Sequence, residues 1–265
     1  MNSKSRIASI LQADSLDAVV TGFHSFQLSQ LILPAELDFN LPTNLRLGHL
    51  AERIVSKLIQ SSTNYTIVYE NFQIIEAQKT IGEIDFIIEN VQEKQLIHLE
   101  LAYKFYLFDP SISPEVINNW IGPNRNDSLM EKLNKLKTKQ FPLLNNSCTA
   151  SSMNTIDITT VSQALCLLVS LFVPYAFKTK LSPVYEKAIK GYYVNLDTFL
   201  NLDNFDKSYY LPPKKEWGMD PSENEIWKDL KDIENQLYTN MHEKQSPLCW
   251  QKQQETYLSF FIVWW

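Results

Sequence analysis

The stretch IGEIDFIIENVQEKQLIHLELAYKFYLF, residues 81–108, places charged side chains where a folded chain buries apolar ones. Two apolar runs, GEIDFIIEN and LIHLELAYKFYLF, flank the polar segment VQEKQ. This pattern predicts two antiparallel strands joined by a turn. Asp85 lies inside the first predicted strand, and Glu100 and Lys104 lie inside the second. These three charged residues are therefore the first candidates for functional residues.

The predicted geometry of the hairpin suggests a chemistry for them. Glu100, Ala102 and Lys104 share one face of their strand, because alternate side chains point the same way. The turn brings Asp85 roughly level with Glu100, where the two carboxylates repel each other and one is pushed toward protonation. A divalent cation relieves this repulsion, and Mg²⁺ is commonly held by one or two carboxylates with waters and phosphate oxygens. With a lysine to orient an attacking water, the residues favour a phosphodiesterase.

The segments around the hairpin predict helices and strands on both sides of it. The N-terminal 33 residues read as one or two helices with a break at Gly22, and a linker lies between Pro34 and Pro42. The further predicted elements are a helix over 44–62, a strand over 65–78, a turn at 79–82, a helix over 127–141, a buried strand or helix at 161–173, a polar helix over 224–243 and a final strand pair.

Composition excludes several classes of protein. The net charge of −6 and the presence of only four arginines argue against bulk electrostatic binding and against sequence-specific reading of DNA. The six glycines are too far apart for a dinucleotide-binding, P-loop or serine-hydrolase motif, and no HExxH is present. The three cysteines form no CxxC pair, which suits a reducing cytoplasm. Residues 158–177 are uncharged, but their polar side chains and Pro174 favour a buried element over a membrane span.

The motif GEIDFII…LIHLELAYK is similar to the active-site hairpin of the PD-(D/E)XK nuclease superfamily, in which G-E-[IL]-D-[FL]-[IL] precedes a strand containing E-x-K. Together with NNWIGPNRNDSLMEKLNKLKTKQ it resembles a bacterial domain-of-unknown-function family, DUF1853, that is grouped with this superfamily. The resemblance implies an α/β fold with a restriction-endonuclease-like core (α-β-β-β-α-β, a mixed sheet flanked by helices). The expected segments are an N-terminal helical segment at 1–45, the nuclease-like core at 46–175 and a C-terminal α+β extension at 176–265.

The resemblance also implies roles for individual residues. Asp85, Glu100 and Glu52 are expected to ligate Mg²⁺ or Mn²⁺. Glu52, on the preceding helix, matches the position where such nucleases place an additional acidic residue. His49 lies one turn before Glu52 on the same helix face. A hydrogen bond is at least as plausible for His98 as a metal contact.

The predicted helix over 127–141 is locally basic. It carries Lys132, Lys135, Lys137 and Lys139, and Gln140 closes it. Such a helix is usually a solvated face, but beside a carboxylate site it suits a phosphate track, with Gln140 near the phosphates as in related enzymes. We expect Lys132, Lys135, Lys139 and Gln140 to contact nucleic-acid phosphates.

One position departs from the superfamily pattern. The lysine expected two residues after Glu100 is replaced by Ala102, and Lys104 lies about 13 Å from Glu100 along the strand. Lys104 is the first candidate for a shifted catalytic lysine, Lys132 is a possible substitute, and a third possibility is that the site no longer cleaves. A plain ion pair between Glu100 and Lys104 on a solvated face is a further alternative.

Three functions follow from these readings. The first is a metal-dependent deoxyribonuclease without strong sequence specificity, in the cytoplasm and without a membrane partner. The second is a catalytically inactive module of the same fold that binds nucleic acid or a partner protein. The third is a structural domain whose acidic residues carry no chemistry.

Overall fold

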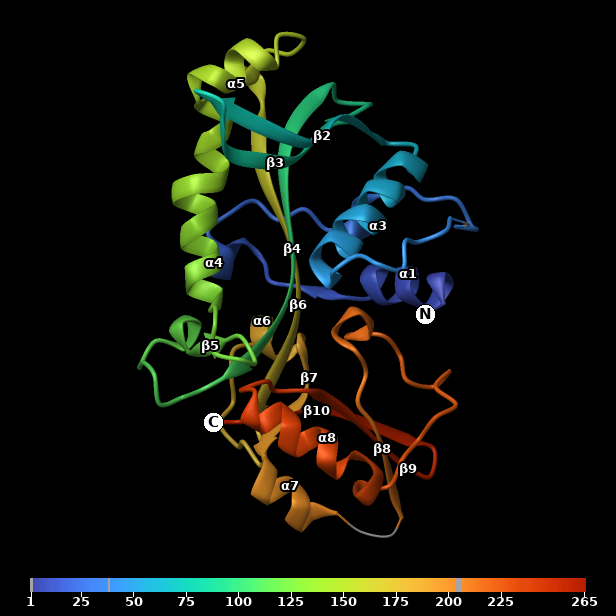
Figure 1. Cartoon of the computed structure of the whole chain (residues 1–265). Coiled ribbons are helices and arrows are strands. Elements are labelled where there is room, and N and C mark those ends of the chain that lie inside the picture. The colour runs from blue at the N-terminus through green and yellow to red at the C-terminus, as the bar shows by residue number, and fades with distance from the viewer. Residues whose placement is uncertain (1, 38, 204–205) are drawn as a thin grey trace. The chain divides into compact units, whose positions relative to one another are not determined.

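The computed structural model describes residues 2–37, 39–203 and 206–265. The remaining residues, in the predicted N-terminal and C-terminal segments, lie outside this description. The chain is an α/β protein in which helices flank a large mixed sheet (Figure 1).

The chain divides into two compact units. The N-terminal unit comprises Asn2–Tyr103 and Glu131–Leu168, and the C-terminal unit comprises Lys104–Met130 and Val169–Trp265. Strands β4 (Gln95–Phe108) and β6 (Ser162–Pro174) each pass from one unit into the other. This division differs from the three expected segments, because residues 104–130 group with the C-terminal unit and residues 2–37 and 39–45 group with the predicted core.

The sheet of the N-terminal unit follows the order β2-β3-β4-β6, and β1 (Asp14–Ser15) pairs with β6. Strands β2 (Tyr65–Glu76), β3 (Lys79–Asn90) and β4 are successively antiparallel, as the sequence predicts. Most of β4 is buried on both faces, which is the pattern of a central strand covered on each side.

The turn between β2 and β3 lies at Ala77 and Gln78, so the predicted turn at 79–82 is wrong. Both residues have positive φ values, 47° and 64°, which is the backbone of a two-residue hairpin turn matched to the twist of its strands. Such turns usually contain glycine or asparagine. Neither is present here, so the sequence carried no local signal for the turn.

The helices of the N-terminal unit begin with α1 (Ser3–Leu11) and α2 (Ala18–Thr21), and Gly22 ends α2 in the left-handed conformation, as expected from the predicted break. Leu50, Ile54 and Leu58 form the buried face of α3 (Leu47–Ser61). Figure 1 shows α3 and α4 on opposite sides of the β4–β6 pair. The short helices are η1 (Leu28–Gln30), α5 (Ser147–Ser152) and η5 (Ile158–Thr160).

The predicted helix over 127–141 changes its character along its length. It begins as α4 (Leu129–Lys135), continues as a π-helical turn, η3 (Leu136–Gln140), and ends as the 3-10 turn η4 (Phe141–Asn145). Pro142 cannot donate a backbone hydrogen bond, so a regular α-helical ladder cannot continue through it. The π-helical turn is the segment that carries Gln140.

The sheet of the C-terminal unit continues from β6 in the order β7 (Ile189–Asn195), β10 (Thr256–Val263), β9 (Leu248–Gln253) and β8 (Lys207–Tyr210). Strands β6, β7 and β10 are parallel, and β9 and β8 are antiparallel to their neighbours. The apolar run predicted at 161–173 is therefore a strand. Strand β5 (Trp120–Ile121) pairs with the end of β4.

The predicted final strand pair is confirmed as β9 and β10. The polar helix expected over 224–243 begins later, as α8 (Leu230–His242), because the side chain of Asp229 accepts a hydrogen bond from the Asp232 N–H and caps it. The other helices of this unit are η2 (Val116–Asn119), α6 (Pro183–Glu186), α7 (Leu196–Leu202) and η6 (Lys214–Glu216). Within the described parts of the chain, no helix is long and apolar enough to cross a membrane.

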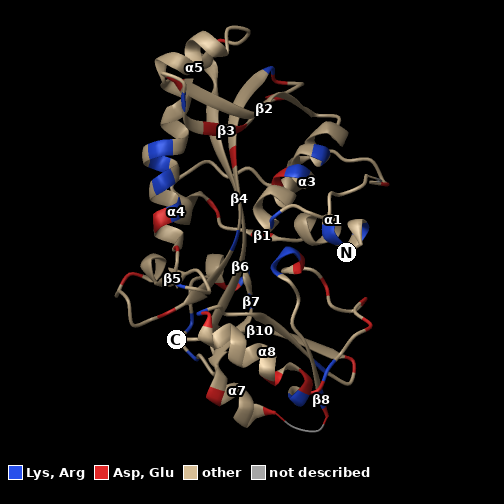
Figure 2. Ribbon diagram, in the orientation of Figure 1, with Lys and Arg blue, Asp and Glu red and all other residues tan. Residues whose placement is uncertain are grey.

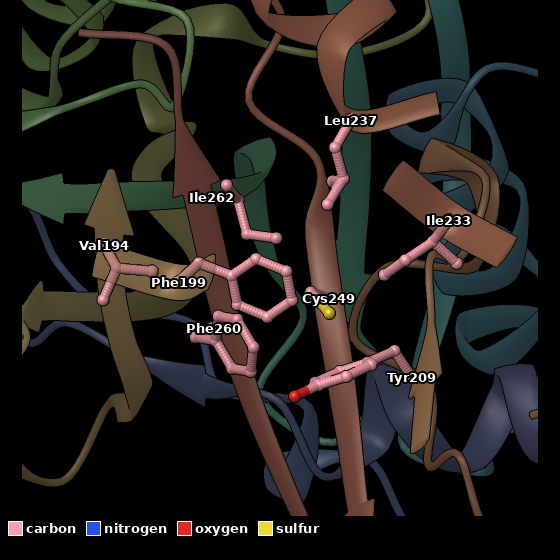
Figure 3. Packing of buried hydrophobic residues seen from close by; sticks show 8 residues of the cluster. All are labelled: Val194, Phe199, Tyr209, Ile233, Leu237, Cys249, Phe260 and Ile262. Carbon is pink, nitrogen blue, oxygen red and sulfur yellow. The ribbon is translucent and has the colours of Figure 1, made fainter. Parts of the chain in front are cut away.

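The C-terminal unit has a hydrophobic core of its own. Helices α7 and α8 cover one face of its sheet, and Figure 3 shows the side chains that meet there. They are Val194, Phe199, Tyr209, Ile233, Leu237, Cys249, Phe260 and Ile262.

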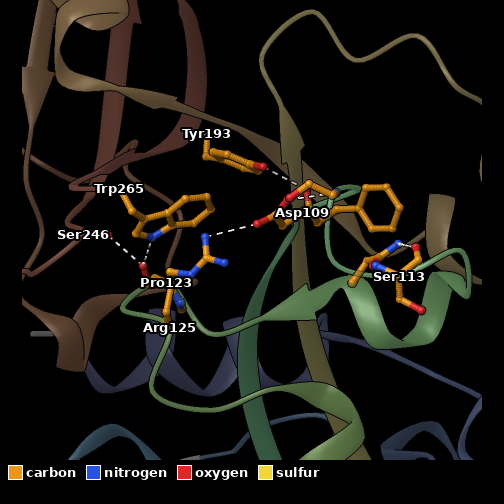
Figure 4. A network of polar contacts seen from close by, with 10 residues as sticks. Asp109, Ser113, Pro123, Arg125, Tyr193, Ser246 and Trp265 are labelled. Atoms are coloured by element: carbon orange, nitrogen blue, oxygen red, sulfur yellow. Dashed lines mark hydrogen bonds and ion pairs between the residues drawn. The ribbon is translucent and has the colours of Figure 1, made fainter.

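A polar network ties the loop after β4 to the end of the chain (Figure 4). The Arg125 guanidinium donates to Asp109 at 3.1 Å and lies over the Trp265 ring, 4.5 Å from its centroid. The Trp265 indole N–H and the Ser246 hydroxyl both donate to the Pro123 carbonyl. These contacts hold the loop that contains Asp127.

A close approach of β7 and β10 gives the first prediction. A Cβ at Gly191 would lie 1.9 Å from the backbone oxygen of Ser259. We expect Gly191→Ala to lower the free energy of unfolding by about 1–3 kcal/mol, because the strands must move apart. The same change at Gly48, an exposed helical glycine with open space around it, is the control and should be neutral or stabilising by up to about 1 kcal/mol. Urea unfolding measures both. Equal effects would contradict the prediction.

Candidate functional site

Asp85 takes part in the hydrogen-bonding pattern of the sheet through its side chain. The ladder between β3 and β4 ends at the pair Phe86–Leu99. One residue beyond it, the Asp85 carboxyl oxygen Oδ2 accepts a hydrogen bond from the backbone N–H of Leu101 at 2.9 Å. A carboxyl group therefore lies between the two strands where a backbone acceptor would otherwise be. The same register sets Asp85 level with Glu100.

The environment of Asp85 disfavours its negative charge. Burial and then the negative charge of Glu100 raise the pKa of Asp85 from 3.8 to about 8, and the charge of Glu52 adds to the effect. The Leu101 hydrogen bond and the positive charge of Lys132 act in the opposite direction. At neutral pH this carboxyl group therefore retains a proton unless an additional cation is present.

Glu100 is completely buried and is held at both of its carboxylate oxygens. Oε1 lies 2.9 Å from Nε2 of His98, and Oε2 accepts a hydrogen bond from Nε2 of Gln140 at 3.3 Å. The same Gln140 nitrogen lies 3.3 Å from the backbone oxygen of Glu83. An ion pair between Glu100 and Lys104 on a solvated face, one of the alternatives above, is therefore wrong.

Lys104 belongs to the C-terminal unit, where its ammonium donates to Asp127 at 2.7 Å. Asp127 in turn accepts at its backbone oxygen from the Gly122 N–H, 2.7 Å away. Sequence reasoning missed Asp127 because no motif spacing connects it to β4. The lysine whose charge acts on Asp85 is instead Lys132 of α4.

Glu52 of α3 is close enough to Asp85 for its charge to matter, but its carboxylate contacts another residue. Its Oε2 lies 3.0 Å from Nδ1 of the exposed His49. In residues 2–37, 39–203 and 206–265, no three His, Cys, Asp or Glu side chains gather into a group that could hold a metal ion. Any cation at this site would thus depend on Asp85 and Glu100, with its other ligands coming from water or substrate.

The helix beside the site exposes a row of lysines. Lys135, Lys137 and Lys139 are exposed on α4 and η3, and Lys132 is half-buried. Figure 2 shows the basic residues gathered along this helix. Gln140, at the end of the row, directs its amide to Glu100. The α4–η3 helix therefore combines a basic surface with a direct hydrogen bond to Glu100.

The model of a family described as a domain of unknown function, DUF1853, matches residues 16–258. The chain belongs to the DUF1853 family. The match covers most of both units and includes every residue of the candidate site. No curated protein matches the chain, and no solved structure matches it. The DUF1853 description names no activity, so a function for the chain has to be argued from the site itself.

The raised pKa of Asp85 predicts how stability depends on pH. Between the ordinary pKa of 3.8 and the folded value of about 8, the folded chain binds a proton that the unfolded chain has lost. Stability should therefore fall as pH rises through this window, by up to about 1.4 kcal/mol per pH unit. In EDTA, Asp85→Asn should remove this dependence. The free energy of unfolding of Asp85→Asn relative to that of the wild type should therefore rise from pH 5 to 8.

The control for this experiment is Asp157→Asn. Asp157 is exposed, and hydrogen bonds from Thr159 lower its pKa, so this change cannot remove a loss of stability at rising pH. Urea unfolding at several pH values measures all three proteins. Parallel curves for the wild type and Asp85→Asn would contradict the assignment of the buried proton.

Proposed function

We propose that this chain is a metal-dependent nuclease that hydrolyses phosphodiester bonds in nucleic acid, with DNA as the expected substrate. The proposed core is restriction-endonuclease-like and consists of α3, β2, β3, β4, α4 and β6. The observation that carries the proposal is the pair of carboxyl groups on adjacent strands, Asp85 and Glu100, in which the charge of one raises the pKa of the other. Such a pair is suited to a divalent cation.

The residues present fit one Mg²⁺ or Mn²⁺ ion. Asp85 accepts one backbone hydrogen bond and Glu100 accepts one contact at each oxygen. Each carboxylate has about four acceptor positions, so both retain lone pairs for a ligand. When bound, the ion would lower the pKa of a water molecule and offset the charge of the phosphate. Asp85 and Glu100 would hold it, and Glu52 would contribute negative charge nearby.

Lys132 is the best candidate to orient the attacking water. It comes from the helix beside the site, and its charge already acts on Asp85. It would take the place of the lysine that the nuclease pattern has at Ala102. The exposed Lys135 and Lys139 would contact the phosphates that flank the cleaved bond. Gln140 would keep Glu100 in position as well as lie near the phosphates.

A second candidate function is a non-catalytic module that binds nucleic acid or a partner protein. The observation that favours it is the loss of the lysine at Ala102 together with the pairing of Lys104 to Asp127. In this case the lysine row would still bind nucleic-acid phosphates, but the carboxylate pair would not support hydrolysis of the phosphodiester bonds.

Metal binding is the first test of the proposal. Isothermal titration of Mn²⁺ should show saturable binding to the wild type that is lost in Asp85→Ala and in Glu100→Ala, with and without DNA present. Glu89→Gln is the matched control, because Glu89 lies on the same strand as Asp85, is partly exposed and pairs with Lys94. Wild-type binding no stronger than that of the alanine variants, in both conditions, would contradict the metal site.

Cleavage of labelled DNA distinguishes the two lysines. We expect Lys132→Ala to lower the rate at least about 100-fold, the usual contribution of a positioned proton-transfer group. Lys104→Ala should cleave at a rate close to wild type, because its ammonium is bound to Asp127. The reverse result would assign the role to Lys104. DNA binding without cleavage by the wild type would favour the non-catalytic module.

A further inference from the structure

We infer that His98 is a positioning residue, which holds the Glu100 carboxylate in the orientation that a metal ion needs. This inference rests on the proposed function, because it concerns the same carboxylate pair. Nothing in the nuclease motif specifies a residue two positions before the glutamate. His98 is completely buried, its imidazole ring makes one polar and one aromatic contact, and one of its ring nitrogens is unpaired among the described residues.

His98 and Glu100 are neighbours on one face of β4, two residues apart. Neither is exposed to solvent, and His98 Nε2 lies 2.9 Å from Glu100 Oε1. The imidazole also packs edge-on against the ring of Phe141, with the centroids 5.2 Å apart. The ring is thus fixed by one polar and one aromatic contact. Since a carboxylate oxygen can only accept, the His98 nitrogen that faces it carries the proton.

The other ring nitrogen of His98 has no hydrogen-bond partner in the part of the chain that the structure describes. Nδ1 is buried, and no polar group of the described residues bonds to it. An unpaired buried nitrogen of this kind is destabilising, because it gives up hydrogen bonds with water and gains none in the fold. Buried polar pairs are also often no more stable than apolar side chains of similar volume. Stability alone would favour an apolar residue at position 98, so the pair is better explained by its effect on Glu100.

That effect is to restrict rotation of the carboxylate. His98 holds Oε1 and Gln140 holds Oε2, so the plane of the carboxylate is set from two sides. The remaining lone pairs then have fixed directions. Carboxylates that ligate metals are generally hydrogen-bonded in this way, and loss of such a partner typically weakens metal affinity 10–100-fold. His98 would supply this support from within the strand itself.

The experiment compares two nearly isosteric substitutions, His98→Gln and His98→Met. Both remove the ring, but only glutamine can donate a hydrogen bond to Glu100. We expect Mn²⁺ to bind His98→Met about 10–100-fold more weakly than the wild type, and His98→Gln to recover most of that loss. Isothermal titration with and without DNA gives the affinities, and urea unfolding shows whether each variant is folded.

Phe23→Leu serves as the packing control. Phe23 lies 4.8 Å from Phe141, centroid to centroid, in the same aromatic group, and it makes no polar contact with the carboxylates. Its Mn²⁺ affinity should equal that of the wild type. If His98→Met does not fold, His98→Gln alone is compared with Phe23→Leu, and an affinity below one-tenth of wild type in His98→Gln overturns the inference.

The outcomes separate this inference from the proposed function. Equal Mn²⁺ affinities for folded His98→Met and His98→Gln overturn the role of His98 while leaving the metal site intact. No Mn²⁺ binding by the wild type, with or without DNA, overturns both. A selective loss in His98→Met supports both.

Discussion

The structure of the N-terminal unit depends on how its sheet accommodates a carboxyl group between two strands. The β3–β4 ladder stops at Phe86 and Leu99, and the Asp85 side chain then accepts the Leu101 N–H. This arrangement brings Asp85 next to the buried Glu100 and makes its negative charge costly. A proton or a cation offsets that charge, and the neighbouring helices act on it in opposite directions, through Glu52 of α3 and Lys132 of α4.

The α4–η3 helix contributes two residues to the same site, one from its α-helical part and one from its π-helical turn. Its α-helical part carries Lys132, whose charge acts on Asp85, and its π-helical turn directs Gln140 to Glu100. π-helical turns are rare in proteins, and those that occur are often found at functional sites. With His98 at the other oxygen, the buried carboxylate is supported from its own strand and from a helix distant in sequence.

Strands β4 and β6 belong to both units, and this explains why Lys104 does not pair with the carboxylates. Beyond Tyr103, β4 enters the C-terminal unit, where Lys104 pairs with Asp127 in a loop tied down by the contacts of Arg125 and Trp265. The Lys104 ammonium therefore binds a residue of this loop and not the carboxylate pair. In the nuclease proposal the corresponding role passes to Lys132 of the helix, whose charge acts on Asp85.

The sequence by itself determined the α/β class, the amphipathic helix α3, the strands of the hairpin and the opposition of Asp85 and Glu100, because side-chain alternation and turn length are local properties. It also marked the basic helix. It did not determine the turn at Ala77 and Gln78, whose left-handed backbone has no glycine to announce it. Only the tertiary structure decided that Lys104 pairs with Asp127, that Lys132 acts on Asp85 and that Gln140 reaches Glu100. These interactions join residues 23 to 47 positions apart in the sequence, and they depend on how distant elements pack.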